Sequence, residues 1–229
     1  MYVWEGELRL ASAGIGDSVR EKKVLWVDTE TGGVVPGKHA LLQVAVLVEI
    51  DGQVVAEHDW TMRPPLGREV TDEALAVNGI TRAGLVDRPS ADDVKPEIDR
   101  FLGRYVNKYD REDKFTIAGY NVAAFDVPFL RDYWTLCGDK YFGSWFTNYP
   151  VDVMAACCML RHYELLGTHE LPNLKLATVC GAFGVALGAA HDALADILAT
   201  RELWEVLVQQ LQQNAPAATP VAPARDGRG

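Results

Sequence analysis

The sequence predicts a single α/β domain, because strand-like segments come first in the chain and helix-like segments follow. Apolar, β-branched runs at residues 24–28 and 41–50 are typical of buried strands. An Asp-Gly pair then marks a tight hairpin turn before a third run at residues 53–60. These three runs favour an antiparallel meander, and a Pro-Pro pair ends the strand-rich part. Helical patterns dominate the rest of the chain, so we expect a sheet flanked by helices.

The helices of the second part are predicted from capping residues and from the spacing of apolar side chains. Thr71 can cap a short helix that ends at Gly79. A stripe of apolar residues favours an amphipathic helix over residues 92–109. A fourth strand is expected at residues 116–120. Further helices are expected over residues 127–136, 153–166, 174–183 and 191–213.

The 229 residues suffice for one sizeable core, and the composition divides the chain into three parts. Residues 1–22 form a leader whose structure the pattern leaves open, and residues 23–213 form the predicted domain. Residues 214–229 are rich in Ala and Pro and cannot bury a core, so we expect a flexible tail there.

The charge balance and the cysteines exclude several classes of protein. The formal net charge of −10 argues against a broad basic surface that wraps duplex nucleic acid. No two cysteines form a CxxC pair, which argues against a zinc site and favours reduced thiols in the cytoplasm. No apolar segment is long enough to span a bilayer, so no membrane partner is expected. The cysteines are Cys137, Cys157, Cys158 and Cys180.

Two acids mark the end of the first strand-like run. Asp28 and Glu30 are two positions apart, so on a strand their side chains point to the same side. Two like charges held together repel each other unless a cation compensates them, and oxygen ligands favour Mg²⁺ or Mn²⁺. Two solvated acids at a strand end are an equally good interpretation of this pair taken alone.

Further acids and a histidine occur at two other element boundaries. Asp126 follows the fourth strand, close to the start of a helix, where an acid interacting with the helix dipole is the ordinary alternative. If Asp192 caps the last helix, His191 lies on the preceding loop and Asp196 in the first turns. The alternative is a loop histidine followed by an ordinary first-turn acid.

The three segments together carry more weight than any one of them. Four carboxylates can hold two divalent ions, one of which activates a water while the other stabilises the leaving oxygen of a phosphodiester. A neutral histidine such as His191 is suited to accept the proton of that water near pH 7. The combined set therefore indicates metal-assisted hydrolysis.

The segments DTETGG, GYNVAAFD and HDALAD resemble, in this order, the three motifs of the DEDDh group of DnaQ-like 3′-to-5′ exonucleases. That group includes the proofreading subunit of bacterial DNA polymerase III, and the resemblance covers roughly residues 22–205. It implies a ribonuclease-H-like fold with a five-stranded mixed sheet flanked by helices, whose fifth strand lies near residues 149–151. It also implies metal ligands at Asp28, Glu30, Asp126 and Asp196, and a general base at His191.

The resemblance extends to residues that would contact the substrate. Thr31, Gly33 and Val34 follow the first two acids, where members of the group approach the terminal nucleotide with backbone groups and an apolar wedge. Asn78 stands where the group usually has a histidine, and it can still donate a hydrogen bond. Asn121 precedes Asp126 by five positions where many members have four, which indicates a longer turn.

The activity that the resemblance implies is removal of nucleoside monophosphates from a single-stranded 3′ end with two Mg²⁺ or Mn²⁺ ions. The sequence leaves DNA against RNA open, and DNA is slightly favoured. The alternative is a catalytically silent module that binds nucleic acid or scaffolds a DNA polymerase. The tail could tether such a polymerase partner, and pairing as a homodimer cannot be read from the sequence.

Several other residues are better explained by structure than by chemistry. Asp152 and Asp192 are more readily helix caps than metal ligands. The aromatic-rich stretch at residues 133–146 could stack bases, but packing is the favoured interpretation. The remaining histidines have no spacing typical of a metal site; they are His39, His58, His162 and His169.

Overall fold

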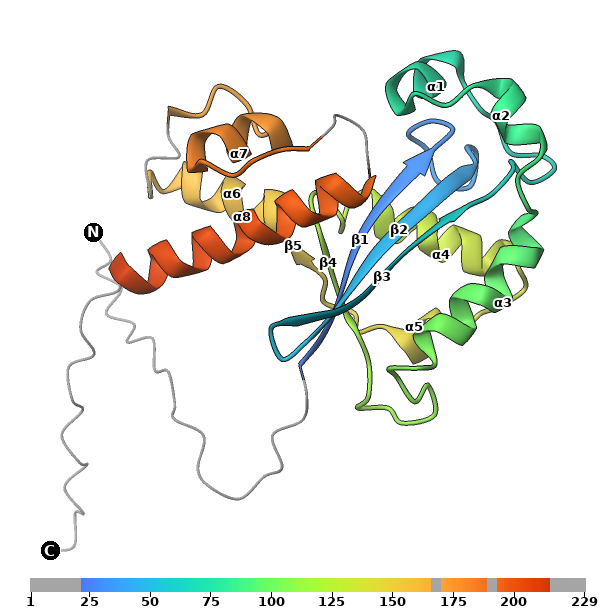
Figure 1. Cartoon of the computed structure of the whole chain (residues 1–229), viewed down its shortest axis with the longest axis horizontal. Helices are drawn as coiled ribbons and strands as arrows, with labels where there is room; N and C mark the ends of the chain where they lie inside the picture. The colour runs from blue at the N-terminus through green and yellow to red at the C-terminus, as the bar shows by residue number, and fades with distance from the viewer. Residues whose placement is uncertain (1–21, 166–169, 189–192, 215–229) are drawn as a thin grey trace, which may run out of the picture.

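A five-stranded mixed sheet forms the centre of the computed structural model, which describes residues 22–165, 170–188 and 193–214 (Figure 1). The strand order is β3-β2-β1-β4-β5. Strands β1, β2 and β3 form the predicted antiparallel meander, whereas β4 runs parallel to β1 and β5 parallel to β4. The strands are β1 (Lys23–Thr31), β2 (Leu41–Ile50), β3 (Gln53–Thr61), β4 (Thr116–Gly119) and β5 (Val151–Asp152). The predicted five-stranded mixed sheet is confirmed.

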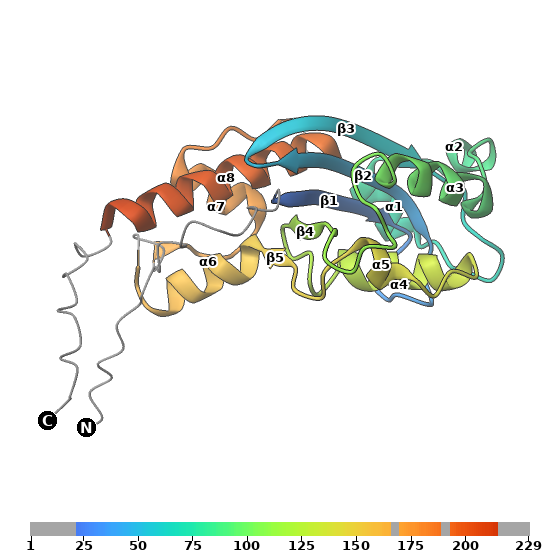
Figure 2. The ribbon, with the colours of Figure 1, turned by 90° about the horizontal axis from the view of Figure 1, so that it is seen from below.

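Helices cover both faces of this sheet. Figures 1 and 2 show α3, α4 and α5 on one side and α6, α7 and α8 on the other. The short helices α1 and α2 lie beyond the end of the sheet where β1 stops. The helices are α1 (Asp72–Asn78), α2 (Arg82–Val86), α3 (Ala91–Leu102), α4 (Asp126–Leu136), α5 (Phe142–Trp145), α6 (Val153–His162), α7 (Leu176–Phe183) and α8 (Ala193–Asn214).

The central strands are nearly continuous apolar runs because both of their faces are buried. In β1, Leu25 and Val27 belong to the core beneath α3 and α4, whereas Trp26 between them belongs to the core beneath α6 and α8. Side chains of successive strand residues point to opposite faces, so this alternation fixes which face each later residue of β1 occupies. It places Asp28 and Glu30 on the side of α8, and Thr29 on the side of α4.

Helix ends follow the predicted caps in some places and depart from them in others. The backbone N–H of Ala74 donates to Thr71 Oγ1, and Gly79 ends α1 in the left-handed conformation, as predicted. The prediction of a helix over residues 92–109 was wrong at its end, because α3 stops at Leu102. Two contacts stabilise the following segment as a loop. Lys23 Nζ of β1 donates to the Tyr105 carbonyl, and within the loop Asp113 accepts the backbone N–H of Asn107.

Other departures are smaller. Helix α6 ends at His162 rather than continuing to residue 166, which lies outside the described residues. The one-turn helices α2 and α5 were not predicted, because so few residues show no apolar periodicity. Helix α8 is described from Ala193, so the predicted start at residues 191–192 falls outside the described part. The predicted leader and tail also lie outside the described residues, except for residues 22 and 214.

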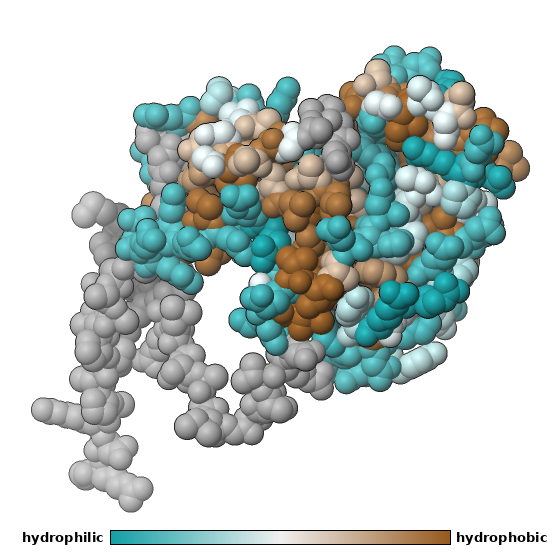
Figure 3. Space-filling model, viewed as in Figure 1, coloured by the Kyte–Doolittle hydropathy of each residue, from teal (hydrophilic) through white to brown (hydrophobic). Residues whose placement is uncertain are grey.

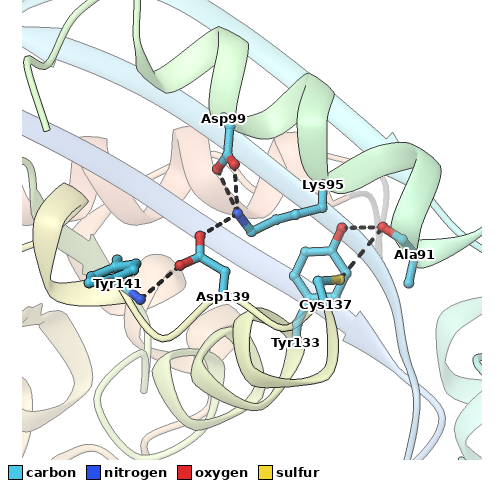
Figure 4. A network of polar contacts seen from close by, with 7 residues as sticks. All are labelled: Ala91, Lys95, Asp99, Tyr133, Cys137, Asp139 and Tyr141. Carbon is cyan, nitrogen blue, oxygen red and sulfur yellow. Dashed lines mark hydrogen bonds and ion pairs between the residues drawn. The ribbon is translucent and has the colours of Figure 1, made fainter.

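A buried lysine joins α3 to the segment that follows α4 (Figure 4). The Lys95 ammonium group donates to both Asp99 carboxylate oxygens, at 2.7 and 2.8 Å, and to Asp139 Oδ2 at 2.8 Å. Burial alone would raise the pKa of Asp139, but hydrogen bonds from Lys95 and from the Tyr141 N–H hold that pKa below its usual value. Nearby, the Tyr133 hydroxyl donates to the Ala91 carbonyl. These contacts fix α4 against α3.

On the face shown in Figure 3, hydrophobic residues gather in several places between hydrophilic ones, including around α1 and α2. One hydrophobic strip runs from α8 over the adjoining part of the sheet. In the part of the chain that the structure describes, no helix combines the length and the apolar character needed to cross a membrane. Each of the four cysteines is a free thiol.

Candidate active site

The carboxyl-terminal part of β1 carries the first two predicted ligands. This strand continues to Thr31, beyond the apolar run, because pairing with β2 extends through Glu30 and Gln43. Pairing with β4 ends earlier, at Trp26. Asp28 and Glu30 therefore extend past the last residues of β4, on the side of α8. Ligand sites in α/β sheets commonly form where neighbouring strands end in this way.

Asp126 reaches the same region from the first residue of α4. Its side chain is buried, with 3% of the residue exposed, and Thr29 Oγ1 donates to Asp126 Oδ1 at 2.7 Å. Thr29 lies between Asp28 and Glu30 on β1, and its side chain points to the opposite face of the sheet. Its bond to Asp126 therefore connects the strand that carries two candidate ligands with the helix that carries the third. Sequence reasoning missed Thr29, although a hydroxyl residue between two acids in a strand is a usable signal.

Asp196 approaches from α8, in the first turn of that helix. Ile197 and Leu203 of α8 are buried in the core beneath the sheet. Farther along, Arg201 Nε donates to Glu49 Oε2 at 2.6 Å and so attaches α8 to β2. These contacts bring the start of α8 to the side of the sheet that carries Asp28.

The charges of these acids interact across three distant segments of the chain. Burial raises the pKa of Asp28 well above its usual value, and the charges of Asp126, Glu30 and Asp196 raise it further. Burial, followed by the charges of Asp196 and Asp126, raises the pKa of Glu30 to about 7. Burial also raises the pKa of Asp126 to about 7, although the hydrogen bond from Thr29 opposes that change. Without a compensating cation, these acids would be partly protonated at neutral pH.

The donor set suits a hard divalent cation. Carboxylate oxygens are the preferred ligands of Mg²⁺ and Mn²⁺, and a cation would relieve the repulsion that raises these pKa values. Among the residues that the structure describes, no three His, Cys, Asp or Glu side chains are already arranged as a metal site. The residue types of the site nevertheless fit a divalent cation, since all four side chains are carboxylates. His191 and Asp192 lie outside the described residues.

The loop that follows β1 is closed by hydrogen bonds around the predicted substrate-contact residues. Thr31 Oγ1 donates to the Gly33 carbonyl, and Asn78 Nδ2 of α1 donates to the Thr31 carbonyl at 2.9 Å. A Cβ atom on Gly33 would lie 2.5 Å from the His39 ring, so only glycine permits this approach. Val34, at 75% exposure, projects from the loop. The structure thus brings Thr31, Gly33, Val34 and Asn78 to the end of β1.

Two residues outside the predicted set stabilise this loop. His39 is buried and its Nδ1 accepts the backbone N–H of Val35 at 2.9 Å. Arg68 donates to the Gly37 carbonyl and, through Nη2, to both carboxylate oxygens of Asp132 on α4, at 2.7 and 2.8 Å. The Arg68 side chain therefore connects the loop between β1 and β2, residues 32–40 (the Val34 loop), to the helix that carries Asp126.

The turn before Asp126 is held by Asp152. Asn121 adopts a left-handed conformation with φ 59°, which provides the expected turn. The backbone N–H groups of Asn121 and Ala123 donate to the two carboxylate oxygens of Asp152. Asp152 also accepts the N–H of Ala155, so its predicted role as the cap of α6 is confirmed. Its second role in positioning the turn was not predicted.

The aromatic-rich stretch at residues 133–146 is mainly core. Tyr133, Trp134 and Trp145 are all almost fully buried, and Trp134 contacts Phe142 edge-on. The favoured interpretation of packing over base stacking is confirmed for these side chains. Tyr141 is the exposed member of the stretch.

Known relatives share both the sequence pattern and the fold. The model of the exonuclease family RNase_T matches residues 25–204. The epsilon subunit of DNA polymerase III from Aquifex aeolicus is 25% identical over 198 residues, which is 85% of this chain and 85% of that protein. A Mycobacterium tuberculosis protein whose name gives it both exonuclease and endonuclease parts is 26% identical over 200 residues, or 85% of this chain and 28% of that protein.

The fold is that of Escherichia coli exonuclease I. A structure of that enzyme in complex with a dT13 oligonucleotide matches with a TM-score of 0.67 and 21% identity, covering 84% of this chain and 42% of that chain. This chain therefore spans less than half the length of exonuclease I. The family match includes all three acidic segments, at Asp28, Asp126 and Asp196. The chain belongs to the RNase_T exonuclease family, within the DnaQ-like DEDDh group of 3′-to-5′ exonucleases.

Proposed function

We propose that this chain is a 3′-to-5′ exonuclease that hydrolyses the last phosphodiester bond of a single strand and releases a nucleoside monophosphate. The observation that carries the proposal is the electrostatic coupling of Asp28 and Glu30 on β1 with Asp126 on α4 and Asp196 on α8. Mutual repulsion of buried acids destabilises a fold. A cluster of four acids in one place is therefore best explained by a positively charged ligand that compensates the repulsion.

The proposed ligands of the metal ions are the same four carboxylates. Exonucleases of this type use divalent metal ions, and we infer two Mg²⁺ or Mn²⁺ ions in this chain. When bound, such ions supply positive charge to the scissile phosphate, lower the pKa of a water and stabilise the leaving 3′ oxygen. Thr29 holds the Asp126 carboxylate in one orientation, and β1 and α8 deliver the remaining oxygens to the same side of the sheet.

The proton of the attacking water would go to His191. A neutral imidazole accepts a proton at neutral pH, and none of the four carboxylates is free for this task if all of them bind metal. His191 precedes the first turn of α8 by sequence, five positions before Asp196.

The loop after β1 would hold the terminal nucleotide. Thr31 and Gly33 are buried and shape the backbone of this loop, which is proposed to contact the nucleotide, and the exposed Val34 can pack against the last base as an apolar wedge. Asn78 lies beside Thr31 and can donate a hydrogen bond to the 3′ hydroxyl or the base. Asn121 lies in the turn before Asp126 and is the remaining candidate for a substrate contact.

The proposed substrate is single-stranded, with DNA slightly favoured over RNA. The net charge of −10 is unsuited to a long duplex, whereas a short strand end can be held by metals and a few contacts. Exonuclease I of Escherichia coli was solved with a DNA oligonucleotide, and the Aquifex relative is a polymerase subunit. On that likeness, a DNA polymerase is the proposed protein partner.

The test is digestion of 5′-labelled DNA and RNA oligomers of one sequence. We expect release of mononucleotides that requires Mg²⁺ or Mn²⁺, is abolished in Asp28→Ala and falls strongly in His191→Ala. Glu97→Gln on the exposed side of α3 is the matched control and should retain full activity. Full activity in Asp28→Ala would refute the proposal. Oligomer binding without any cleavage would instead favour the silent module.

A further inference from the structure

A surface hollow lies at the end of the sheet opposite to the four acids. It has a volume of about 490 Å³ and is formed by the loop that follows α3, together with Trp145 of α5. Figure 1 shows this loop beside α5, at the end of the sheet where β1 begins. The hydrogen bond from Lys23 Nζ to the Tyr105 carbonyl confirms that placement. The volume falls within the range of small-ligand sites, roughly 300–1,000 Å³.

The hollow is a positive region of an acidic protein. Residues 100–114 contain five Lys or Arg and three Asp or Glu, in a chain whose formal net charge is −10. Arg104 and Lys108 line the hollow and are exposed, and no carboxylate side chain is among its lining residues. The nearby Asp113 is held by Lys23 at 2.7 Å and by the backbone N–H of Asn107 at 2.9 Å. The hollow therefore offers cations to an anionic ligand.

Aromatic rings accompany these cations. The Lys108 ammonium group lies 5.2 Å from the centre of the Trp145 ring and 5.7 Å from the centre of the Tyr109 ring. Trp145 is buried and forms the floor, whereas Tyr109 is 86% exposed and presents its ring to solvent. A free aromatic face beside exposed cations is the combination on which single-stranded nucleic-acid sites are built.

The loop is held in shape before any ligand arrives. In addition to the bond from Lys23, the Tyr109 N–H donates to Asn107 Oδ1 at 3.2 Å. The backbone N–H groups of Tyr105 and Val106 both donate to the Leu102 carbonyl. A site whose backbone is already ordered loses less conformational entropy when it binds.

We propose that this hollow binds one nucleotide unit, with the phosphate between Arg104 and Lys108 and the base stacked on Tyr109. Two sources share that chemistry: a free mononucleotide, and an upstream nucleotide of a strand whose 3′ end is at the acids. The second source rests on the proposed nuclease function. Lys23 and Asp28 are five positions apart on β1, a distance of about 17 Å at roughly 3.3 Å per residue. That distance is roughly five stacked nucleotides at about 3.4 Å each, so short oligomers would not reach the hollow.

The first experiment measures KM and kcat for oligomers of about three and about twelve nucleotides. The variants are Tyr109→Ala and the double variant Arg104→Glu with Lys108→Glu. The control is Lys175→Glu, an exposed charge reversal just before α7, across the sheet. If the hollow holds an upstream nucleotide, KM for the long oligomer rises about tenfold in the hollow variants, as expected for loss of one stacked base. KM for the short oligomer, kcat and the control stay unchanged.

The second experiment measures binding of a fluorescent mononucleotide without divalent metal. Binding that is lost in both hollow variants and retained in Asp28→Ala would identify a free nucleotide as the ligand. If the chain cleaves no oligomer at all, the nuclease proposal fails, and this second measurement still decides whether the hollow binds a nucleotide. Two sets of results would overturn the proposal, and in both the hollow variants bind the mononucleotide like the unaltered chain. In the first, KM for the long oligomer is also unaffected; in the second, no oligomer is cleaved.

Discussion

The Thr29 hydroxyl donates a hydrogen bond to the buried Asp126 carboxylate at 2.7 Å, across the sheet from the side on which Asp28 and Glu30 lie. The two residues are 97 positions apart, and their bond is a direct polar link between β1 and the start of α4. Since Asp126 is a proposed metal ligand, Thr29 determines which carboxylate oxygen stays available and where it points. We therefore regard Thr29 as a positioning residue.

Replacing Thr29 by Val should test that role, because Val keeps the shape and removes the donor. We expect weaker Mg²⁺ binding by calorimetry and a roughly tenfold lower kcat, since one hydrogen bond to a charged group contributes about 1.5–3 kcal/mol. Thr29→Ser retains the donor and should recover most of the activity. Equal metal affinity in the Val and Ser variants would contradict the role.

Arg68 should act on substrate binding rather than on folding alone. Its guanidinium joins the Gly37 carbonyl of the Val34 loop to Asp132 of α4, with two bonds to that carboxylate. Arg68 uses Nη1 for Gly37 and Nη2 for Asp132, and lysine has only one nitrogen for both partners. Arg68→Lys should therefore raise KM several-fold with a smaller change in kcat.

The matched control for Arg68 is Arg82→Lys, which alters an exposed ion pair with Asp72. It should leave KM unchanged, because exposed pairs of this kind contribute little. A KM in Arg68→Lys equal to that of the control would remove the proposed link between the loop and α4.

The pKa values of the acids predict how stability changes with pH. Glu30 and Asp126 have folded-state pKa values of about 7, above those of unfolded carboxyl groups. Their contribution is fully present below about pH 4 and is lost as pH rises towards 7, because deprotonation then costs more in the folded state. Without divalent metal, Tm should fall between about pH 4 and pH 7, with a loss of several kcal/mol, since each unit of pKa shift corresponds to about 1.4 kcal/mol.

Two comparisons isolate the cause of that fall. Millimolar Mg²⁺ should raise Tm most at the upper end of the range, because a ligand that binds only the folded chain stabilises it. Glu30→Gln should flatten the metal-free pH dependence by removing one titrating group from the cluster. A Tm that increases with pH in the metal-free chain would be inconsistent with clustered acids.

The Lys95 network should be a major contributor to stability. Lys95→Met would leave Asp99 and Asp139 close together without their shared cation. Removing one member of a buried ion pair costs about 3–5 kcal/mol, and Tm should drop by roughly 6–12 °C in a chain of this size. Lys140→Met, at an exposed site, should change Tm little. Adding Asp139→Asn to Lys95→Met should recover part of the loss.

Local signals account for what the sequence predicted well. Thr71 and Gly79 bound α1 as expected because a cap is formed by neighbours in the chain. The pairing of β2 with its neighbours follows from its continuous apolar run. The side shared by Asp28 and Glu30 follows from strand alternation alone.

Contacts between distant segments account for what the sequence did not predict. The segment after Leu102 forms a loop, and Lys23 of β1 binds the Tyr105 carbonyl of that loop from 82 positions away. Strand β1 extends beyond its apolar run because β2 continues to pair with it. The spacing of apolar residues within one segment gives no information about contacts with distant segments. The bond between Thr29 and Asp126 could not be predicted for the same reason.

Asp152 gives the molecule a mechanical property. One carboxylate caps α6 and also holds the turn that leads into Asp126, through three backbone N–H groups. Asp152 therefore couples the start of α6 to the turn that positions the proposed metal ligand Asp126. A substitution inside α6, far from any nucleotide, can consequently alter the rate of cleavage without touching the substrate. Surveys of mutations in this chain should expect sensitive positions on α6 as well as around the acids.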